Sequence, residues 1–221
     1  MAPRKATVTT SQAEGQRLIG READRAGVSL AAGAADALLA YFELLLRWGQ
    51  RINLTAAGSI ATLALDHLPD ALAIVSRLSA RDDRAPGSVR RLVDAGSGGG
   101  LPAIPLALLR PEMVLVLVES TAKKAAFLRT AIRELGLEGR VQVENRRVER
   151  EGEPGGFDGA TSRAMLAPAE WLPVGRLLVR PGGLVFCLSS RAIGAPPAGL
   201  ELVHEASYRS DRWLAELQRS T

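Results

Sequence analysis

Hydrophobic residues in the first third of the chain recur at steps of three and four positions. One such set lies within residues 38–52 and a second within residues 60–78, so the spacing predicts amphipathic helices between residues 14 and 78. Pro69 interrupts the second set and is expected to kink or restart that helix, because proline lacks the backbone N–H that a helix needs. Residues 80–88 are polar and contain proline and glycine, which is typical of a linker.

The pattern changes after residue 89, where short apolar runs alternate with helical periodicity. The run Val114–Val118 is continuously apolar, as expected of a strand buried on both faces of a parallel sheet. Helices are expected from Pro102 onward and over residues 121–135, and residues 200–217 are compatible with a closing hairpin. The predicted strands cover residues 90–95, 114–119, 141–145, 157–162 and 183–188.

This alternation predicts an α/β fold with a Rossmann-like, mostly parallel sheet and a closing antiparallel strand. We expect a flexible N-terminus at residues 1–10 and a helical N-terminal extension with its linker at residues 11–88. The sheet domain is expected to occupy residues 89–221.

Composition narrows the class of protein. The 221 residues are 47% hydrophobic, which is enough for a substantial core. With one cysteine and two histidines, we expect no metal site. The sequence shows no signal sequence and no membrane-spanning run, so we expect a cytoplasmic protein. We also expect it to be a monomer. The net charge of +4 favours a polyanionic partner, although coding bias explains a composition rich in arginine and alanine equally well.

Glycines concentrate directly after the first predicted strand. Gly96, Gly98 and Gly100 alternate with other residues and lead into Leu101 and Pro102. A turn this tight, followed at once by a helix, lets a nucleotide-like ligand approach bare backbone at the helix N-terminus. A dinucleotide-binding fingerprint requires a third glycine at position 101. The spacing therefore favours an S-adenosylmethionine (AdoMet) methyltransferase over an NAD-dependent enzyme.

Glu119 ends the second predicted strand, 19 residues after Gly100. An acid at this point of nucleotide-binding α/β folds accepts hydrogen bonds from the ribose hydroxyls. The alternative interpretation of Glu119 is a solvated acid at the end of a strand. Ligands of such sheets lie beyond the carboxyl ends of the strands. The cofactor-binding candidates at these ends are Asp94, Gly96, Ser97, Gly98, Gly100, Leu101, Glu119, Ser120 and Thr121.

Basic residues gather after the third and fourth predicted strands and on the helix expected at residues 121–135. A basic rim beside the cofactor site suits contacts with the phosphates of a nucleic acid, and a solvated charged face is the alternative. The candidate RNA-binding residues are Lys123, Lys124, Arg129, Arg133, Arg146, Arg147 and Arg150.

The sequence lacks features that several base-methylation reactions need. No Asn/Asp-Pro-Pro-aromatic loop for amine methylation is present, and Cys187 lies inside a predicted buried strand rather than at a site for a nucleophile. His67 falls on an apolar stripe and is expected to be a packed or capping residue. A methyl acceptor with a free lone pair, such as guanine N7, needs no base, so positioning and electrostatics would suffice. Arg163, at the end of the fourth predicted strand, is the candidate catalytic residue.

Further motifs carry a family resemblance over residues 38–190. They include Asn53-Leu54-Thr55, His67 with Asp70, and a glycine turn that ends in Leu-Pro-x-Ile-Pro, followed later by Ser162-Arg163-Ala164. With these motifs the chain resembles the RsmG/GidB family of bacterial small-subunit (16S) rRNA guanine-N7 methyltransferases.

The resemblance implies a class I AdoMet-methyltransferase fold, AdoMet as the cofactor, and 16S rRNA of the small ribosomal subunit as the substrate. It implies that Val148 and Glu149 flank the adenine of AdoMet and that Arg163 lies between cofactor and substrate. It also places Gly96, Leu101 and Glu119 in the AdoMet pocket.

Two alternatives remain open on the sequence alone. One is an AdoMet methyltransferase that acts on another RNA base, a protein or a small molecule, which Asp66 and Ser189-Ser190 favour because the family usually has other residues there. The other is an AdoMet-binding, ribosome-associated factor without catalytic activity.

Overall fold

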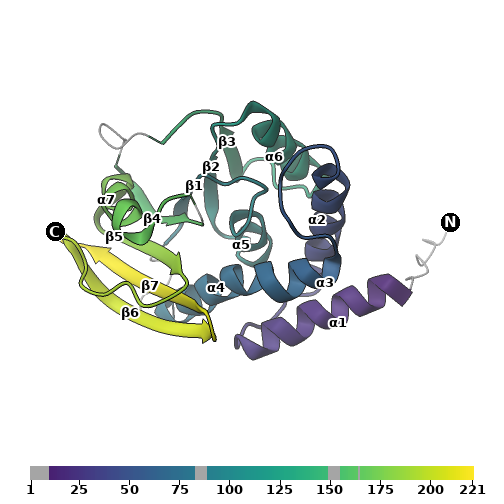
Figure 1. Ribbon diagram of the computed structural model, residues 1–221, viewed down its shortest axis with the longest axis horizontal. Coiled ribbons are helices and arrows are strands. Elements are labelled where there is room, and N and C mark those ends of the chain that lie inside the picture. Colours follow the sequence, from purple (N-terminus) through teal and green to yellow (C-terminus); the bar gives the residue numbers. More distant parts are fainter. Residues whose placement is uncertain (1–9, 83–88, 149–154, 164) are drawn as a thin grey trace.

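The described N-terminal part is helical, as the periodicity predicts. The computed structural model describes residues 10–82, 89–148, 155–163 and 165–221. A short π-helical segment joins two of the helices, and Pro69 is the second residue of the helix that follows, so the predicted restart is confirmed. Figure 1 shows these elements. They are α1 (Thr10–Arg25), α2 (Ala34–Gly49), α3 (Ile60–Thr62), the π-helix η1 (Leu63–His67) and α4 (Leu68–Asp82).

The prediction of a linker at residues 80–88 is wrong for the first three of these residues, because α4 continues through Asp82. Arg81 donates to the buried carboxylate of Glu216 at 2.6 Å, and Asp82 pairs with Arg110. Glu216 and Arg110 are distant in sequence from α4, so the polar composition of residues 80–82 did not indicate that they are helical. Residues 83–88 lie outside the described residues.

The strands of the described chain form one mixed sheet of seven in the order β3-β2-β1-β4-β5-β7-β6. Strands β1 to β5 are parallel to one another, whereas β7 is antiparallel to both β5 and β6. This confirms the predicted mostly parallel sheet with an antiparallel closing element. The strands are β1 (Arg91–Ala95), β2 (Val114–Val118), β3 (Val141–Glu144), β4 (Phe157–Ser162), β5 (Val179–Ser189), β6 (Leu200–Arg209) and β7 (Arg212–Arg219).

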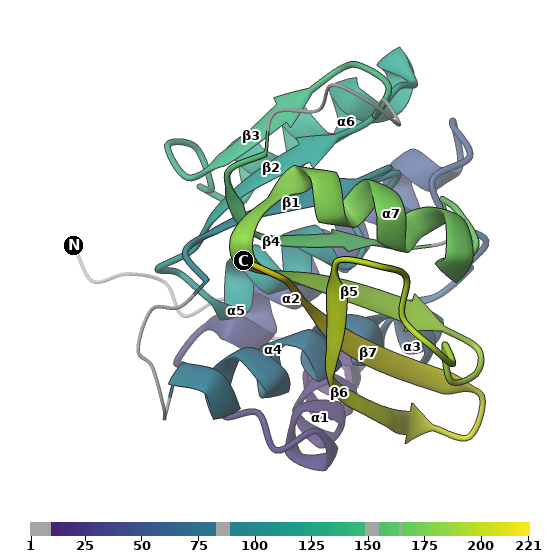
Figure 2. The ribbon, with the colours of Figure 1, turned by 90° about the vertical axis from the view of Figure 1, so that its left-hand side faces the viewer.

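Alternating strand residues divide the core between the two faces of the sheet. Leu92 and its same-face neighbours pack with residues of α2, α4, α5 (Ala103–Leu109) and α6 (Ala122–Glu134), whereas Val93 packs with residues of α7 (Pro168–Leu178). Figure 2 shows α7 lying across the strands. The first cluster runs from Ile19 to Leu214, so the N-terminal helices and the sheet share one core. The proposed division at residue 89 stays a prediction.

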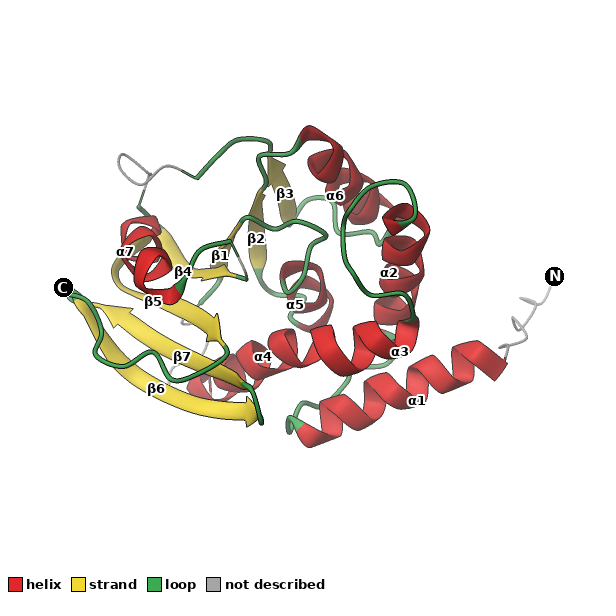
Figure 3. Ribbon diagram, in the orientation of Figure 1, coloured by secondary structure: helices red, strands yellow, loops and turns green. Residues whose placement is uncertain are grey.

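The turn of the C-terminal hairpin lies at the ligand edge of the sheet. Because β7 runs antiparallel to β5, Trp213 at its start pairs with Ser189 at the end of β5. The carboxyl ends of β1 and β4 meet at the same edge, since Ala95 pairs with Ser162. Figure 3 shows the hairpin as two long strands beside α4. The fold therefore brings residues of α4 and the hairpin to the edge where parallel sheets bind ligands.

Candidate functional site

The glycine turn after β1 has a backbone that other residues adopt only with strain. Gly96, Gly98 and Gly100 have φ values of 72°, 57° and 88°. The Gly96 N–H donates to the carbonyl of Val118 at 2.9 Å, which ties the turn to the end of β2. A Cβ on Gly100 would lie 2.5 Å from Cγ1 of Ile104, whereas a Cβ on Gly98 would meet nothing closer than 3.9 Å. Gly98 thus leaves open space beside the turn, where a ligand could approach the backbone.

Helix α2 holds the same turn from the N-terminal part of the chain. The hydroxyl of Tyr41 donates to the carbonyl of Gly99 at 2.7 Å, in a fully buried contact. Burial raises the pKa of Tyr41, so it stays a neutral donor. A Cβ on Gly99 would lie 2.9 Å from Cδ1 of Leu45 in the same helix. The N-terminal helices therefore support the site directly, which no local motif of the turn indicates.

Glu119 joins the two loops that follow β1 and β2. Its Oε2 accepts the N–H of Gly98 at 2.9 Å and its Oε1 accepts the N–H of Thr121 at 2.7 Å. The side chain is buried, and the side-chain amide of Asn145 donates to its backbone carbonyl at 2.8 Å. Each carboxylate oxygen retains a further lone pair. The carboxylate is thus fixed in position with acceptor capacity left for a ligand.

A cavity of about 260 Å³ adjoins the turn and brings several predicted residues together. Gly96, Ser120 and Val148 line it, and these are three of the predicted cofactor-binding residues. Met165 also lines it, and a Cβ on Gly96 would lie 2.7 Å from its sulfur. Sequence reasoning missed Met165, because an isolated methionine after a strand carries no recognisable signal. Arg146 and Arg147, predicted to bind RNA, and Val118 complete the lining.

Asp94 is buried beneath the turn with an unsatisfied carboxylate. Within the described residues, neither of its side-chain oxygens has a hydrogen-bond partner, and the same holds for the hydroxyl of Thr161. The two residues are register partners on β1 and β4, so their side chains lie on one face of the sheet. Burial raises the pKa of Asp94 from 3.8 to about 7. Buried polar atoms are normally hydrogen-bonded. A cationic or N–H-bearing ligand would provide the hydrogen-bond donor that the Asp94 carboxylate lacks.

Arg163 follows β4 and is bound by residues of the N-terminal helices. Its Nη1 donates to Nδ1 of His67 at 2.8 Å and to Oδ2 of Asp70 at 2.9 Å. Burial lowers the pKa of His67, and Arg163 lowers it further, so the ring accepts as a neutral imidazole. The π-helix η1 ends at His67 and α4 begins at the next residue. This segment therefore places the two acceptors of the Arg163 guanidinium.

Asp70 connects Arg163 to the C-terminal hairpin. Its Oδ1 accepts the hydroxyl of Tyr208 at 2.8 Å and Nη1 of Arg212 at 3.0 Å. Asp70 is only 4% exposed, so these donors compensate a buried charge. We call Asp70, Arg163, Tyr208 and Arg212 the Asp70 cluster. Membership of Tyr208 and Arg212 in this cluster was not predictable from local patterns, because their contacts with Asp70 span more than 130 residues.

The remaining predicted residues are more widely spread. Ser97 and Leu101 are buried within the turn, and Ser97 Oγ donates to the carbonyl of Asp94 at 3.0 Å. Thr121 is the exposed N-cap of α6. Lys123 and Lys124 follow in the first turn of α6, and exposed Arg129 and Arg133 lie further along the helix. Glu149 and Arg150 lie outside the described residues.

Cys187 packs inside the sheet, away from any nucleophilic role. Cys187 is buried in β5, and burial raises its pKa to about 12, which confirms it as a core residue. No group of three or more potential metal ligands was found among the described residues. No helix in the part of the chain that the structure describes is long and apolar enough to cross a membrane.

Comparison with solved structures places the fold among methyltransferases. A putative O-methyltransferase from Klebsiella pneumoniae superposes with a TM-score of 0.57 over 95% of this chain and 97% of its own, at 17% identity. A putative methylase, HI0767, from Haemophilus influenzae gives a TM-score of 0.54 over 69% of this chain and 100% of its own, at 14% identity. At these identities the likeness concerns the fold alone.

Sequence comparison is more specific. A protein named ribosomal RNA small subunit methyltransferase G from Xanthomonas axonopodis pv. citri is 41% identical over 175 residues, covering 77% of this chain and 78% of the relative. A protein of the same name from Stenotrophomonas maltophilia is 40% identical over 181 residues, covering 80% of this chain and 81% of the relative. The GidB family model, described as rRNA small subunit methyltransferase G, matches residues 34–193. This match spans the glycine turn, Glu119, Asp70 and Arg163, and the chain belongs to the rRNA small subunit methyltransferase G family.

Proposed function

We propose that this chain transfers the methyl group of AdoMet to N7 of a guanine in 16S rRNA of the small ribosomal subunit. The observation that carries the proposal is the junction of the glycine turn with Glu119 and the adjoining cavity, at the sheet edge where Arg163 emerges. A rigid carboxylate beside bare backbone suits a ribose, and an arginine at the same edge suits the polar edge of a base.

The residues around the turn fit AdoMet as the cofactor. Glu119 retains acceptor capacity for ribose hydroxyls, and the buried carboxylate of Asp94, which has no partner among the described residues, suits a cationic group. When bound, AdoMet would supply a methyl group activated by a positively charged sulfur. The residues that we propose to hold it are Asp94, Gly96, Ser97, Gly98, Gly100, Leu101, Glu119, Ser120, Thr121, Val148, Glu149 and Arg163.

The side chains near Arg163 are compatible with guanine N7 as the methyl acceptor. Cys187 is buried with a raised pKa, so it does not act as a nucleophile. Neutral His67 already accepts a hydrogen bond from Arg163. Guanine N7 has a lone pair and loses no proton on methylation, so the chain needs to position the base rather than remove a proton. We assign that positioning to Arg163, whose planar guanidinium can donate to the guanine edge or to a phosphate.

AdoMet binding tests the cofactor half of the proposal. We expect Glu119→Ala to weaken AdoMet by about 1.5–3 kcal/mol, the usual range for hydrogen bonds to a charged group, as measured by isothermal titration calorimetry. Glu138→Ala removes an exposed acid after α6 and is the matched control, with an unchanged dissociation constant. Equal affinities in the wild type and Glu119→Ala would show that Glu119 does not contact the cofactor.

Methyl transfer tests the substrate half. Wild-type protein, radiolabelled AdoMet and small ribosomal subunits from cells lacking this protein should give one labelled rRNA, and nucleoside mass mapping should identify 7-methylguanosine. Bulk tRNA and total protein are the control substrates. Label recovered in those controls, or at another base, would contradict the proposed acceptor. AdoMet binding without methylation of any rRNA would instead support a catalytically silent factor.

A further inference from the structure

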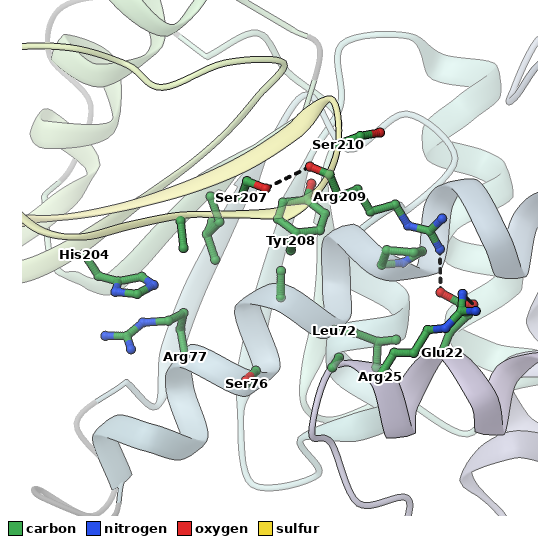
Figure 4. Close-up of a pocket in the computed structure, with 15 residues that line it drawn as sticks. Glu22, Arg25, Leu72, Ser76, Arg77, His204, Ser207, Tyr208, Arg209 and Ser210 are labelled. Atoms are coloured by element: carbon green, nitrogen blue, oxygen red, sulfur yellow. Dashed lines mark hydrogen bonds and ion pairs between the residues drawn. The ribbon is translucent and has the colours of Figure 1, made fainter.

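A second and larger cavity lies outside the glycine turn and Glu119. It measures about 620 Å³, is open to solvent on one side, and is lined by residues of α1, α4 and the β6–β7 hairpin. Figure 4 shows its lining, with Tyr208 near the middle. None of the predicted cofactor residues lines it, so AdoMet binding as proposed above does not account for it. We call it the hairpin cavity.

The walls of the hairpin cavity combine apolar surface with basic ends. The ring of Tyr208, together with Ala26 and Ala206, contributes partly exposed apolar surface. Arg25 and Arg209 lie at one end, and Arg77 and His204 at the other, as Figure 4 shows. Such an arrangement suits a ligand with a flat, weakly polar part and a negatively charged part.

The charge balance of the cavity favours an anion. Three arginines line it against a single carboxylate, that of Glu22. Glu22 is buried and is already paired with both Arg25 and Arg209, and Arg77 is paired with the buried Glu216 at 2.9 Å. The side chain of Arg25 is nevertheless 63% exposed. It can therefore bind a further anionic group without breaking the contacts that compensate Glu22.

The cavity is connected to the proposed site of methyl transfer through one residue. Tyr208, which lines the cavity, donates to Oδ1 of Asp70, and Arg163 donates to Oδ2 of the same carboxylate. The hairpin turn next to the cavity also lies at the edge where β1 and β4 end. A polymer that places one unit at Arg163 can therefore place a nearby unit in the hairpin cavity.

We propose that the hairpin cavity binds a nucleotide of the RNA substrate other than the guanine that is methylated. Its base lies against the ring of Tyr208, and its phosphate lies at Arg25. The cavity volume is ample for one nucleotide, since ligand sites of about 300–1,000 Å³ hold molecules of that size. Aromatic stacking with arginine contacts is a common way of holding an unpaired nucleotide. The proposal rests on RNA being the substrate, as proposed above.

Two variants test the cavity in different ways. Ser76→Trp places a large ring in the cavity without removing a charge, since Ser76 is a half-buried lining residue of α4. Arg25→Gln removes the exposed cation at one end. Arg21→Gln is the matched control, because Arg21 is exposed one turn earlier on α1 and does not line the cavity. All three variants should bind AdoMet with the wild-type dissociation constant.

The main readout is affinity for the small ribosomal subunit in a filter-binding assay, measured apart from methylation. We expect Ser76→Trp to weaken binding on the order of tenfold, as for loss of one stacked base. Arg25→Gln should reduce the slope of log affinity against log salt by about one, as for loss of one phosphate contact. Arg21→Gln should change that slope less. In addition, rRNA carrying 4-thiouridine should crosslink to a peptide containing Tyr208.

The outcomes separate this inference from the proposed function. Wild-type affinity in both Ser76→Trp and Arg25→Gln would overturn the hairpin cavity as an RNA site, even if methylation proceeds normally. Equal slopes in Arg25→Gln and Arg21→Gln would also count against it. Weakened RNA binding in Ser76→Trp, with no methylation by the wild type, would support the cavity and contradict the proposed reaction.

Discussion

Two glycines of the same turn have different physical roles, which substitution by alanine can separate. Gly98 has open space around its missing Cβ, so we expect Gly98→Ala to fold, with about 1–2 kcal/mol of strain from its left-handed backbone. Its methyl group enters the space assigned to AdoMet and should weaken cofactor binding by about 1–3 kcal/mol. Gly100→Ala meets Ile104 and should instead destabilise the fold by about 3 kcal/mol.

Thermal unfolding and calorimetric titration of the two glycine variants check this prediction. Gly98→Ala should show a nearly normal unfolding temperature with weak AdoMet binding. Gly100→Ala should show the larger loss of stability. Tight AdoMet binding by Gly98→Ala would place the cofactor away from this part of the turn.

The raised pKa of Asp94 predicts how the free energy of unfolding changes with pH. Its pKa is about 7 in the folded chain and 3.8 as the reference for an exposed carboxyl. Between these values the folded state holds a proton that the unfolded state has released, so the free energy of unfolding falls as pH rises from about 4 to about 7. The full shift corresponds to about 4 kcal/mol as an upper bound. An asparagine at this position has no such titration.

The expected result is therefore a smaller pH dependence in Asp94→Asn. Urea unfolding without AdoMet, at pH 5 and pH 8, should show a loss of stability in the wild type that the variant largely lacks. A variant that loses as much stability as the wild type over this range would show that Asp94 is ionised in the folded chain throughout.

Residues of the site could be predicted where the sequence motif that identifies them is formed by residues close together in the chain. The glycine spacing and the acid at the end of β2 lie close together in sequence, and the structure joins them through the Gly98–Glu119 hydrogen bond. Tyr41 and Met165 reach the same turn from other elements. Nothing in their own sequence neighbourhood distinguishes them from ordinary core residues, so only the folded chain identifies them.

At the scale of elements, the Asp70 cluster joins α4, the end of β4 and the hairpin. Asp70→Asn keeps the shape but removes the charge and replaces one acceptor oxygen with a donor, so Arg163 and Arg212 lose the buried carboxylate that they share. We expect Asp70→Asn to lower the free energy of unfolding by about 3 kcal/mol, as for a broken buried ion pair. Arg163→Lys keeps the charge and should change the unfolding temperature by only a few degrees.

Kinetics distinguish positioning from stability in these two variants. Arg163→Lys should lower kcat/KM for rRNA by about 10- to 1,000-fold, because lysine cannot reproduce the planar donor fork. Asp70→Asn, assayed well below its unfolding temperature, should lower kcat/KM in the same direction through misplaced Arg163. Full activity in Arg163→Lys would remove this residue from the reaction, and full activity in Asp70→Asn would reduce Asp70 to a purely structural role.

The elements themselves were largely predictable, and the errors lie where pairing is nonlocal. The expected strand at residues 183–188 begins earlier, at Val179, which pairs with Phe157 of β4. The sequence pattern did not predict this extension because it contains Pro181, Gly182 and Gly183, and proline and glycine usually mark turns. The last turn of α4 was predicted as part of a linker because its residues are polar. In the structure these polar residues pair with Glu216 and Arg110.

At the scale of the whole molecule, the N-terminal helices pack with the sheet and take part in the site. They contribute to the same hydrophobic core as the sheet, and they supply Tyr41, His67 and Asp70 to the site. A stretch of helical periodicity predicts an extension but not what that extension does. The structure shows that this part of the chain holds both the glycine turn and Arg163.

Four of the seven basic residues predicted to bind RNA lie along α6, and their contribution is also best tested at this scale. Lys123 and Lys124 lie in its first turn, next to Thr121 and the cofactor loop, whereas Arg133 lies in its last turn. At 1.5 Å per residue, Arg133 is about 15 Å further along the helix than Lys123. RNA bound at the sheet edge should therefore contact the two lysines more closely than Arg133.

Salt dependence of binding to the small ribosomal subunit measures these contacts. Each lost phosphate contact lowers the slope of log affinity against log salt by about 0.7–0.9. We expect the double variant Lys123→Gln/Lys124→Gln to lose about 1–2 in slope while AdoMet affinity stays unchanged, and Arg133→Gln to lose less than half of that. Equal losses in both variants would mean that RNA runs along the full length of α6. No loss in either would move the RNA path away from this helix, toward Arg163 and the hairpin.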